Sequence, residues 1–202
     1  AREKNRMSGT KLRGYDGVAV TQPYTEQYVR QSDKGAGWFL GRTLAGVLEN
    51  SGVQKSDVDG LVVTSMSLAP DSPPALAEHF GLSLRWLESV PCGGASGVIA
   101  LQRAARAVQA GDAEIVACIA GDSSSKGSFA GAVSRFSNFS MDAAWPYGAA
   151  GPNAIFALIT TAYMQRYGAE REDFGRLCIE QREIARANPL ALLRQPLSMD
   201  DY

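Results

Sequence analysis

The sequence is poor in the residues that build metal sites and disulfide frameworks. It has one histidine, His79, and three cysteines, Cys92, Cys118 and Cys178, and it contains no Cys-x-x-Cys spacing. An odd number of thiols without paired spacing is typical of a reducing compartment, so we expect a cytoplasmic protein without disulfides. A structural zinc needs several closely spaced Cys or His ligands, and this sequence has no such group. We therefore expect no metal and no other resident cofactor.

Charge and hydropathy also lack extremes. The 20 Lys and Arg residues balance 21 Asp and Glu residues, the net charge is −1, and no long run has one sign. Composition therefore gives no support to nucleic acid or an anionic membrane as a partner. Residues 1–14 are polar and have no apolar core, so we expect a flexible lead-in there rather than a secretory signal or a membrane span.

Common phosphate-binding and hydrolase motifs are missing as well. The sequence has no Gly-x-Gly-x-x-Gly and no Gly-Lys-Ser or Gly-Lys-Thr phosphate loop, which disfavours a nucleotide-binding domain. The Gly-x-Ser-x-Gly elbow of hydrolases is also absent, because Gly97 directly follows Ser96.

Predicted strands and helices alternate between residues 15 and 125. Apolar runs typical of buried strands occur at 15–20, 59–65, 87–92 and 114–120. Helical patterns, each closed by a nearby glycine, occur at 38–50, 72–80 and 98–110. This alternation predicts an α/β fold with a layered parallel sheet and right-handed crossovers. We expect residues 15–125 to form its core.

The composition changes in residues 126–202. A stretch rich in Ser, Gly, Phe and Asn reaches residue 141, and helical patterns follow at 152–167 and 170–187. We expect a loop region followed by helices, and long irregular segments of compact domains are often functional. No closing strand follows, so we expect the first half of a longer protein, cut before its C-terminal half.

A glycine-rich elbow, residues 92–97, joins the strand at 87–92 to the helix at 98–110. Such elbows carry nucleophiles or oxyanion donors, because N–H groups at a helix start are unpaired and the helix dipole favours negative charge. The helix is apolar on nearly every side apart from Arg103 and Arg106. A helix of this kind is buried between layers, so we expect more chain or a partner to cover the side that the sheet leaves open.

Short motifs along the sequence agree with one known family. They are Gly94-Ala95-Ser96-Gly97, Ala110-Gly111-Asp112-Ala113, Gly121-Asp122, Tyr147-Gly148, Gly151-Pro152, Tyr167-Gly168, Ala187-Asn188-Pro189 and Pro196-Leu197-Ser198. Together they resemble the thiolase superfamily, most of all its sterol-carrier and lipid-transfer branch. The resemblance implies the N-terminal of two thiolase-like α-β-α-β-α layered halves, with an inserted loop region, an acyl-CoA substrate and a homodimer. The strand at 87–93 should form a sheet edge, which also favours pairing with a second copy.

In that family the nucleophilic cysteine opens the elbow as Cys-x-Ser-Gly, and the matching position in this sequence is Gly94. Cys92 stands two residues earlier. That shift moves a side chain by about 6–7 Å along an extended strand, away from the helix N-terminus that lowers a thiol pKa. We therefore expect no nucleophile at Gly94 and a small buried thiol at Cys92. His79 is expected to be a surface or packing residue at a helix end.

Without the cysteine, covalent thiolysis lacks its acyl carrier. A retro-aldol cleavage needs only an oxyanion hole for the enolate and a base for the β-hydroxyl group. The resemblance extends to relatives without this cysteine, the aldolases that shorten steroid side chains as CoA thioesters with a zinc-ribbon/OB-fold partner protein. We expect the same non-covalent cleavage of a bulky lipid or steroid CoA, with Gly94 making room for it. The alternatives are a conventional thiolase or acetyl-CoA acyltransferase using Cys92, and a non-catalytic lipid-transfer or scaffold protein.

Other residues are candidates for catalysis or for contacts with the substrate. Gly93 and Ser96 belong to the elbow, and Ser123 follows a predicted strand, where α/β sheets bind ligands or simply turn. In the loop region, Tyr147 could line an acyl or sterol tunnel, and Arg135 could approach the CoA phosphates. Packing and solvation are the alternative roles for these two side chains.

Overall fold

The computed structural model describes residues 14–124, 137–149 and 151–202, apart from the side chain of Ser140. The chain divides into two compact units. Unit 1 comprises Ala1–Glu26 and Lys34–Ser123, and unit 2 comprises Gln27–Asp33 and Ser124–Tyr202. Most of the predicted flexible lead-in lies outside the described residues.

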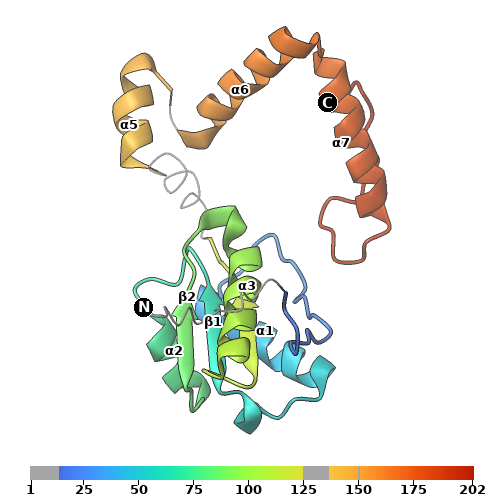
Figure 1. Cartoon of the computed structure of the whole chain (residues 1–202). Helices are drawn as coiled ribbons and strands as arrows, with labels where there is room; N and C mark the ends of the chain where they lie inside the picture. Colours follow the sequence, from blue (N-terminus) through green and yellow to red (C-terminus); the bar gives the residue numbers. More distant parts are fainter. Residues whose placement is uncertain (1–13, 125–136, 150) are drawn as a thin grey trace, which may run out of the picture. The chain divides into compact units, whose positions relative to one another are not determined.

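Unit 1 is built around a three-stranded parallel sheet (Figure 1). The strands lie in the order β2-β1-β3 and are β1 (Gly60–Thr64), β2 (Trp86–Ser89) and β3 (Val116–Ala120). Val63 lies opposite Ser89 on one side and Ile119 on the other. The predicted parallel α/β arrangement is confirmed, and β2 is an edge strand as expected. Because all strands run the same way, their C-terminal ends meet at one edge of the sheet, where such sheets bind ligands.

The helices that flank the sheet end where the sequence predicts. They are α1 (Ala36–Ser51), α2 (Pro73–Phe80) and α3 (Ser96–Ala110). Each is followed by a glycine in the left-handed conformation, with φ of 72°, 65° and 80° at Gly52, Gly81 and Gly111. The N-cap of α2 is Ser72, whose hydroxyl oxygen accepts a hydrogen bond from the Ala75 N–H. These caps and stops explain why the helices can be located from the sequence.

Helices cover both faces of the sheet (Figure 1). α1 and α2 pack against one face, where the buried side chains are Leu40, Leu44, Val58, Leu61, Val63, Leu76, Ala77, Ala117 and Ile119. α3 packs against the other face, where they are Val62, Val90, Ala100 and Ala104. Successive residues of β1 therefore alternate between two cores, which is why this strand is an unbroken apolar run in the sequence.

α3 is buried on one side only. Its small residues Ala100, Ala104 and Ala107 are buried, whereas Val98 and Leu101 are 76% and 49% exposed. The described residues form a single sheet and leave the outer side of α3 open, which agrees with the expectation that this sheet covers only one side of the helix. That further chain or a partner covers the outer side stays a prediction.

The predicted first strand at 15–20 is not a strand. The chain next to it is instead held by polar side chains of α3, because Arg106 and Gln109 donate to the Gly14 carbonyl at 2.9 and 3.3 Å. The Arg106 guanidinium also lies over the Tyr15 ring, 4.5 Å from its centroid. Among the described residues, β3 is consequently left with a free edge.

Unit 2 is helical in its described part. Its helices are α5 (Asn138–Ala144), α6 (Gly151–Tyr167) and α7 (Arg171–Arg186), with a 3₁₀ turn at Trp145–Tyr147. The two longer helices confirm the prediction, and Gly168 ends α6 with φ of 67°. The Arg171 side chain donates to the Tyr202 carbonyl at 2.8 Å, which brings the segment after α7 back to the start of that helix. No helix in the described ranges combines the length and apolarity needed to cross a membrane.

Candidate functional site

The elbow stands at the C-terminal edge of the sheet, between β2 and α3. The last buried residue before it is Val90, whose N–H donates to the Val63 carbonyl at 3.1 Å. Gly93 then takes the left-handed conformation, with φ of 58°, which favours glycine because other residues are strained there. A 3₁₀ turn, Gly93–Ala95, leads directly into α3 at Ser96. The elbow is therefore held at the start of a helix of 15 residues.

Ser96 fixes the shape of the elbow from inside. It is 3% exposed, and its hydroxyl oxygen accepts the Cys92 N–H at 2.9 Å. The Ala95 N–H donates to the Cys92 carbonyl at 3.3 Å and closes the same turn. The structure thus gives Ser96 a role in shaping the elbow, and a catalytic role for this residue stays a prediction.

The glycines of the elbow leave its outer side open. A Cβ atom built at Gly93, Gly94 or Gly97 would have no neighbouring heavy atom within 4 Å. The N–H groups of Gly93 and Gly94 donate to no carbonyl among the described residues, and the α3 dipole adds positive potential here. The N–H groups of the elbow can therefore donate hydrogen bonds to the oxygen of a carbonyl or an enolate. At Gly94 it has no nucleophile.

The three cysteines are free thiols in different surroundings. Cys92 is exposed, so the expectation of a small buried thiol is wrong. The turn carries Cys92 away from the core, in which Val90 is the last buried residue. Cys118 packs against the α3 core, and burial raises the pKa of its thiol to about 11, so it is protonated and unreactive at neutral pH. Cys178 is half-buried on α7.

A polar network lies at the same edge, where β1 and β3 end. The Asp122 Oδ1 atom accepts the Ser65 hydroxyl at 2.9 Å, the Met66 N–H at 2.7 Å, and both the N–H and the hydroxyl of Ser67 at 2.8 Å. The Ser123 N–H donates to the Ser67 hydroxyl oxygen at 2.9 Å. The sequence singled out Ser123 but not its partner loop. The available signal was a pair of serines directly after one buried strand and an aspartate directly after its neighbour.

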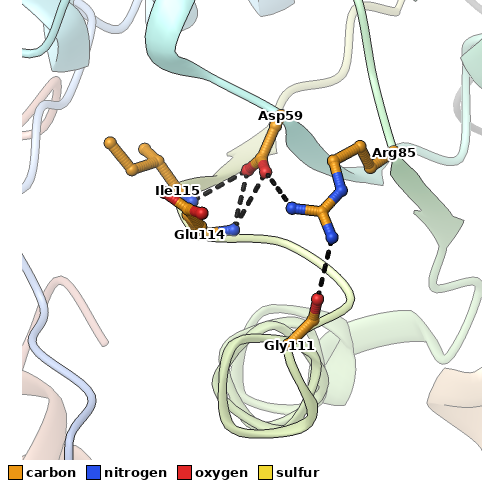
Figure 2. A network of polar contacts seen from close by, with 5 residues as sticks. All are labelled: Asp59, Arg85, Gly111, Glu114 and Ile115. Carbon is orange, nitrogen blue, oxygen red and sulfur yellow. Dashed lines mark hydrogen bonds and ion pairs between the residues drawn. The ribbon is translucent and has the colours of Figure 1, made fainter.

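The opposite edge of the sheet is closed by Asp59 (Figure 2). Its carboxylate accepts the N–H groups of Glu114 and Ile115 at 2.9 Å, and the Arg85 guanidinium lies 3.4 Å from Oδ2. Arg85 also donates to the Gly111 carbonyl at 3.0 Å. Burial opposes the ionisation of Asp59, but the two N–H donors and Arg85 outweigh it and hold the pKa of this carboxyl below its usual range. This network ties together the segments that precede the three strands.

The remaining candidates do not join the elbow within unit 1. Tyr147 lies in the 3₁₀ turn of unit 2 and is 87% exposed, and Arg135 lies outside the described residues. His79 is exposed at the end of α2, with its ring 5.7 Å from that of Phe80, which confirms the prediction of a helix-end surface residue. The structure contains no cluster of metal-ligating side chains in its described part.

Comparison with known proteins agrees with the fold. No protein-family model matches the chain. A "Steroid side-chain-cleaving aldolase" from Thermomonospora curvata is 32% identical over 163 residues, which cover 77% of this chain and 41% of the relative. A "17-hydroxy-3-oxo-4-pregnene-20-carboxyl-CoA lyase" from Mycobacterium tuberculosis is 28% identical over 163 residues, which cover 77% of this chain and 42% of the relative. A solved structure, the "Ltp2-ChsH2(DUF35) aldolase", is 28% identical with a TM-score of 0.68, and the match covers 84% of this chain and 44% of that chain.

The three-stranded parallel sheet and its flanking helices match part of a thiolase-like fold. Within that class the chain is related to the Ltp2 steroid side-chain-cleaving aldolase, and the identity is about 30% over most of the length of this chain. The fold class and the resemblance that the sequence predicted are therefore confirmed. The chain spans less than half the length of these relatives.

Proposed function

We propose that this chain is part of an enzyme that cleaves a carbon–carbon bond of a bulky acyl-CoA thioester by a retro-aldol reaction, without an acyl-enzyme. Its distant homologues are aldolase and lyase enzymes. The observation that carries the proposal is the open elbow, where Gly94 has no side chain and free space around it. The backbone N–H groups of this elbow can stabilise an enolate oxygen, and Gly94 has no thiol that could form a thioester with the substrate.

The reaction needs few groups. A base takes the proton of the β-hydroxyl group, a β-carbonyl forms, and the bond between the α- and β-carbons breaks. The electron pair of that bond passes into the thioester as an enolate, whose oxygen the Gly93 and Gly94 N–H groups hold. A proton then adds to the α-carbon, so the products are a ketone and a shortened acyl-CoA. We place the base in the part of the full protein that this chain does not span, because the relatives are more than twice as long as the matched region.

A steroid side chain is the substrate class that we propose. The Mycobacterium tuberculosis relative is named for 17-hydroxy-3-oxo-4-pregnene-20-carboxyl-CoA. In that thioester the β-hydroxyl group sits on a ring carbon, so retro-aldol cleavage gives a 17-ketosteroid and propanoyl-CoA. A tertiary alcohol carbon is crowded, and the missing side chain at Gly94 leaves room for it beside the N–H donors.

We also propose a partner protein and a dimer for the full-length enzyme. The solved relative is named as an assembly with ChsH2(DUF35), which supports a DUF35 protein as partner, and the zinc-ribbon/OB-fold partner that the resemblance implies stays a prediction. The edge strand β2 has a free side among the described residues. Pairing with a second copy would satisfy its backbone groups and protect an apolar edge.

The test uses the full-length protein with its partner and 17-hydroxy-3-oxo-4-pregnene-20-carboxyl-CoA. We expect the ketosteroid and propanoyl-CoA in equal amounts, with an unmodified intact protein mass during turnover. Gly94→Val should stop the reaction, whereas Cys92→Ala should not. An acyl adduct on Cys92 would instead establish conventional thiolase chemistry, and binding of the thioester without turnover would favour a lipid-transfer or scaffold role.

A further inference from the structure

We propose that Asp122 is a positioning residue of this site, which holds the loop Ser65–Ser67 beside the elbow and so fixes one wall of the space in which the acyl-CoA reacts. The inference rests on the proposed function and adds to it a residue that acts at a distance from the reacting atoms. Among the described residues, the Asp122 carboxylate bonds only to the loop. Its influence on the elbow therefore passes through the loop.

The hydrogen bonds of Asp122 converge on one oxygen atom. The N–H groups of Met66 and Ser67 are consecutive in the chain, and both point at Oδ1, at 2.7 and 2.8 Å. Consecutive N–H groups that converge in this way form a concave anion site, which a carboxylate from the end of β3 fills here. The hydroxyls of Ser65 and Ser67 add two further donors to the same atom. Hydrogen bonds to a charged acceptor are about twice as strong as neutral ones, so the loop conformation depends on this one carboxylate.

The strand register places the loop next to the elbow. β1 is the central strand, with β2 on one side and β3 on the other. At its end, the Val63 carbonyl accepts the Val90 N–H on the elbow side, and the Thr64 carbonyl accepts the Gly121 N–H on the β3 side, both at 3.1 Å. Ser65 is the next residue. The loop therefore leaves the sheet between the elbow and the end of β3.

An unpaired hydroxyl lies at the same end of β1. The Thr64 Oγ1 atom is buried and has no hydrogen-bond partner in the described structure. Side chains alternate along a strand, so Thr64 shares a face with Val62, which packs against the α3 core. Buried hydroxyl groups in native proteins are nearly always paired. A water molecule, a ligand or further chain would supply the partner of this hydroxyl, close to where the loop and the elbow begin.

The position of the loop matters because the elbow holds the reacting thioester by N–H groups alone. With no covalent bond to keep the substrate in place, a displacement of about 1 Å lowers the rate by about 100-fold. Asp122→Ala removes the acceptor of four donors, and kcat should fall by about 100-fold. KM should rise by only about threefold, since the loop borders the reacting end of the substrate and leaves the rest of its contacts in place. Asp122→Asn keeps an oxygen acceptor but loses the charge, so it should restore part of the lost kcat.

The experiment compares Asp122→Ala and Asp122→Asn with a matched control, Asp112→Asn, in the full-length protein with its partner. Asp112 is exposed directly after α3, and its side chain makes no bond among the described residues. We measure kcat and KM for 17-hydroxy-3-oxo-4-pregnene-20-carboxyl-CoA per folded molecule, together with amide hydrogen exchange at Met66 and Ser67. The expected order of kcat is wild type and Asp112→Asn together, then Asp122→Asn, then Asp122→Ala. A wild-type kcat in folded Asp122→Ala, whatever its thermal stability, would overturn the proposal.

Hydrogen exchange separates this proposal from the proposed function. If the wild-type protein does not cleave the thioester, the proposed function fails. The role of Asp122 is then tested by amide hydrogen exchange in the loop and by calorimetric measurement of propanoyl-CoA binding. Asp122 remains a positioning residue if its alanine variant exchanges faster at Met66 and Ser67 and binds propanoyl-CoA more weakly, while Asp112→Asn changes neither. Unchanged exchange or unchanged binding in Asp122→Ala would overturn the assignment of Asp122 by itself.

Discussion

Asp59 and Asp122 stand at opposite edges of the same sheet, and each accepts backbone N–H groups from a neighbouring segment. Asp59 has an ion-pair partner, Arg85, and its side chain is 19% exposed. Asp122 is exposed and bonds to N–H and hydroxyl groups alone. A carboxylate that accepts backbone N–H groups thus ties together the segments at the N-terminal ends of the strands, and another shapes a loop at their C-terminal ends.

The two ends of the strands also differ in how tightly the residues around them are packed. A Cβ atom built at Gly60, beside Asp59, would lie 2.7 Å from the Val116 side chain, so the chain there has no room for another substituent. A Cβ atom built at Gly94 would meet no heavy atom within 4 Å. Ligands of parallel α/β sheets bind at the C-terminal edge. In unit 1 the closed edge is the N-terminal one and the open edge is the C-terminal one.

The largest effect should come from filling the open edge. Gly94→Val places a branched side chain over the elbow, and turnover of the β-hydroxyacyl-CoA should fall by at least about 100-fold. The free energy of unfolding should change by less than about 0.5 kcal/mol, because the new side chain meets no neighbour. Gly35→Val is the matched control, since a Cβ atom there also has no contact within 4 Å. Equal loss of turnover in the two variants would contradict a special role for the elbow.

Asp59→Ala should show that Asp59 acts on the stability of the chain, whereas Asp122 acts on turnover. The substitution leaves the N–H groups of Glu114 and Ile115 and the Arg85 guanidinium without their acceptor, so the free energy of unfolding should fall by about 2 kcal/mol. Because the closed edge is remote from the elbow along the strands, kcat per folded molecule should stay unchanged. Urea denaturation and turnover measured on the same sample check both statements. A lowered kcat in folded Asp59→Ala would contradict the claim that only the C-terminal end of the sheet takes part in turnover.

The Asp59 carboxyl also predicts a smaller, pH-dependent effect. Its pKa is lower in the folded chain than its ordinary value. Its contribution to stability is therefore complete above the unfolded pKa of about 4 and is lost as the pH falls through the folded pKa. The free energy of unfolding should decline below about pH 4, and Asp59→Asn should lack this part of the decline. Identical acid profiles for the two proteins would argue against a lowered pKa at this position.

The smallest expected effect is a difference in reactivity between an exposed thiol, Cys92, and a thiol in the α3 core, Cys118. At mildly alkaline pH, iodoacetamide should label the exposed Cys92 and spare Cys118, since burial raises the pKa of Cys118 to about 11. Peptide mapping by mass spectrometry distinguishes the two sites. Equal labelling rates would mean that the core between β3 and α3 opens readily in solution.

Local chemistry explains what could be predicted from the sequence. The helix ends follow from Gly52, Gly81 and Gly111, which adopt the left-handed conformation that the predicted stops require. The strands β1, β2 and β3 follow from their apolar runs, and the parallel order follows from the helices between them. That Gly94 stands where a nucleophilic cysteine would be expected follows from the resemblance of the elbow to the Cys-x-Ser-Gly motif of the thiolase family.

What the sequence did not predict depends on contacts between distant residues. The Asp122 network joins residues 55 positions apart, and nothing local in the chain specifies that pairing. The segment at 15–20 has the apolar pattern of a strand, but Arg106 and Gln109 hold the adjoining backbone at α3. The exposure of Cys92 depends on the direction in which the turn carries one residue, which its sequence neighbours do not fix.

The most direct test of an elbow without a nucleophile is the kcat of Cys92→Ala in the full-length protein with its partner. No acyl group passes through the thiol in the proposed reaction. The variant should therefore release ketosteroid and propanoyl-CoA in equal amounts, with kcat within about twofold of the wild type. Loss of turnover in Cys92→Ala, together with an acylated Cys92 in the wild-type protein, would contradict the proposed reaction and place the nucleophile at Cys92.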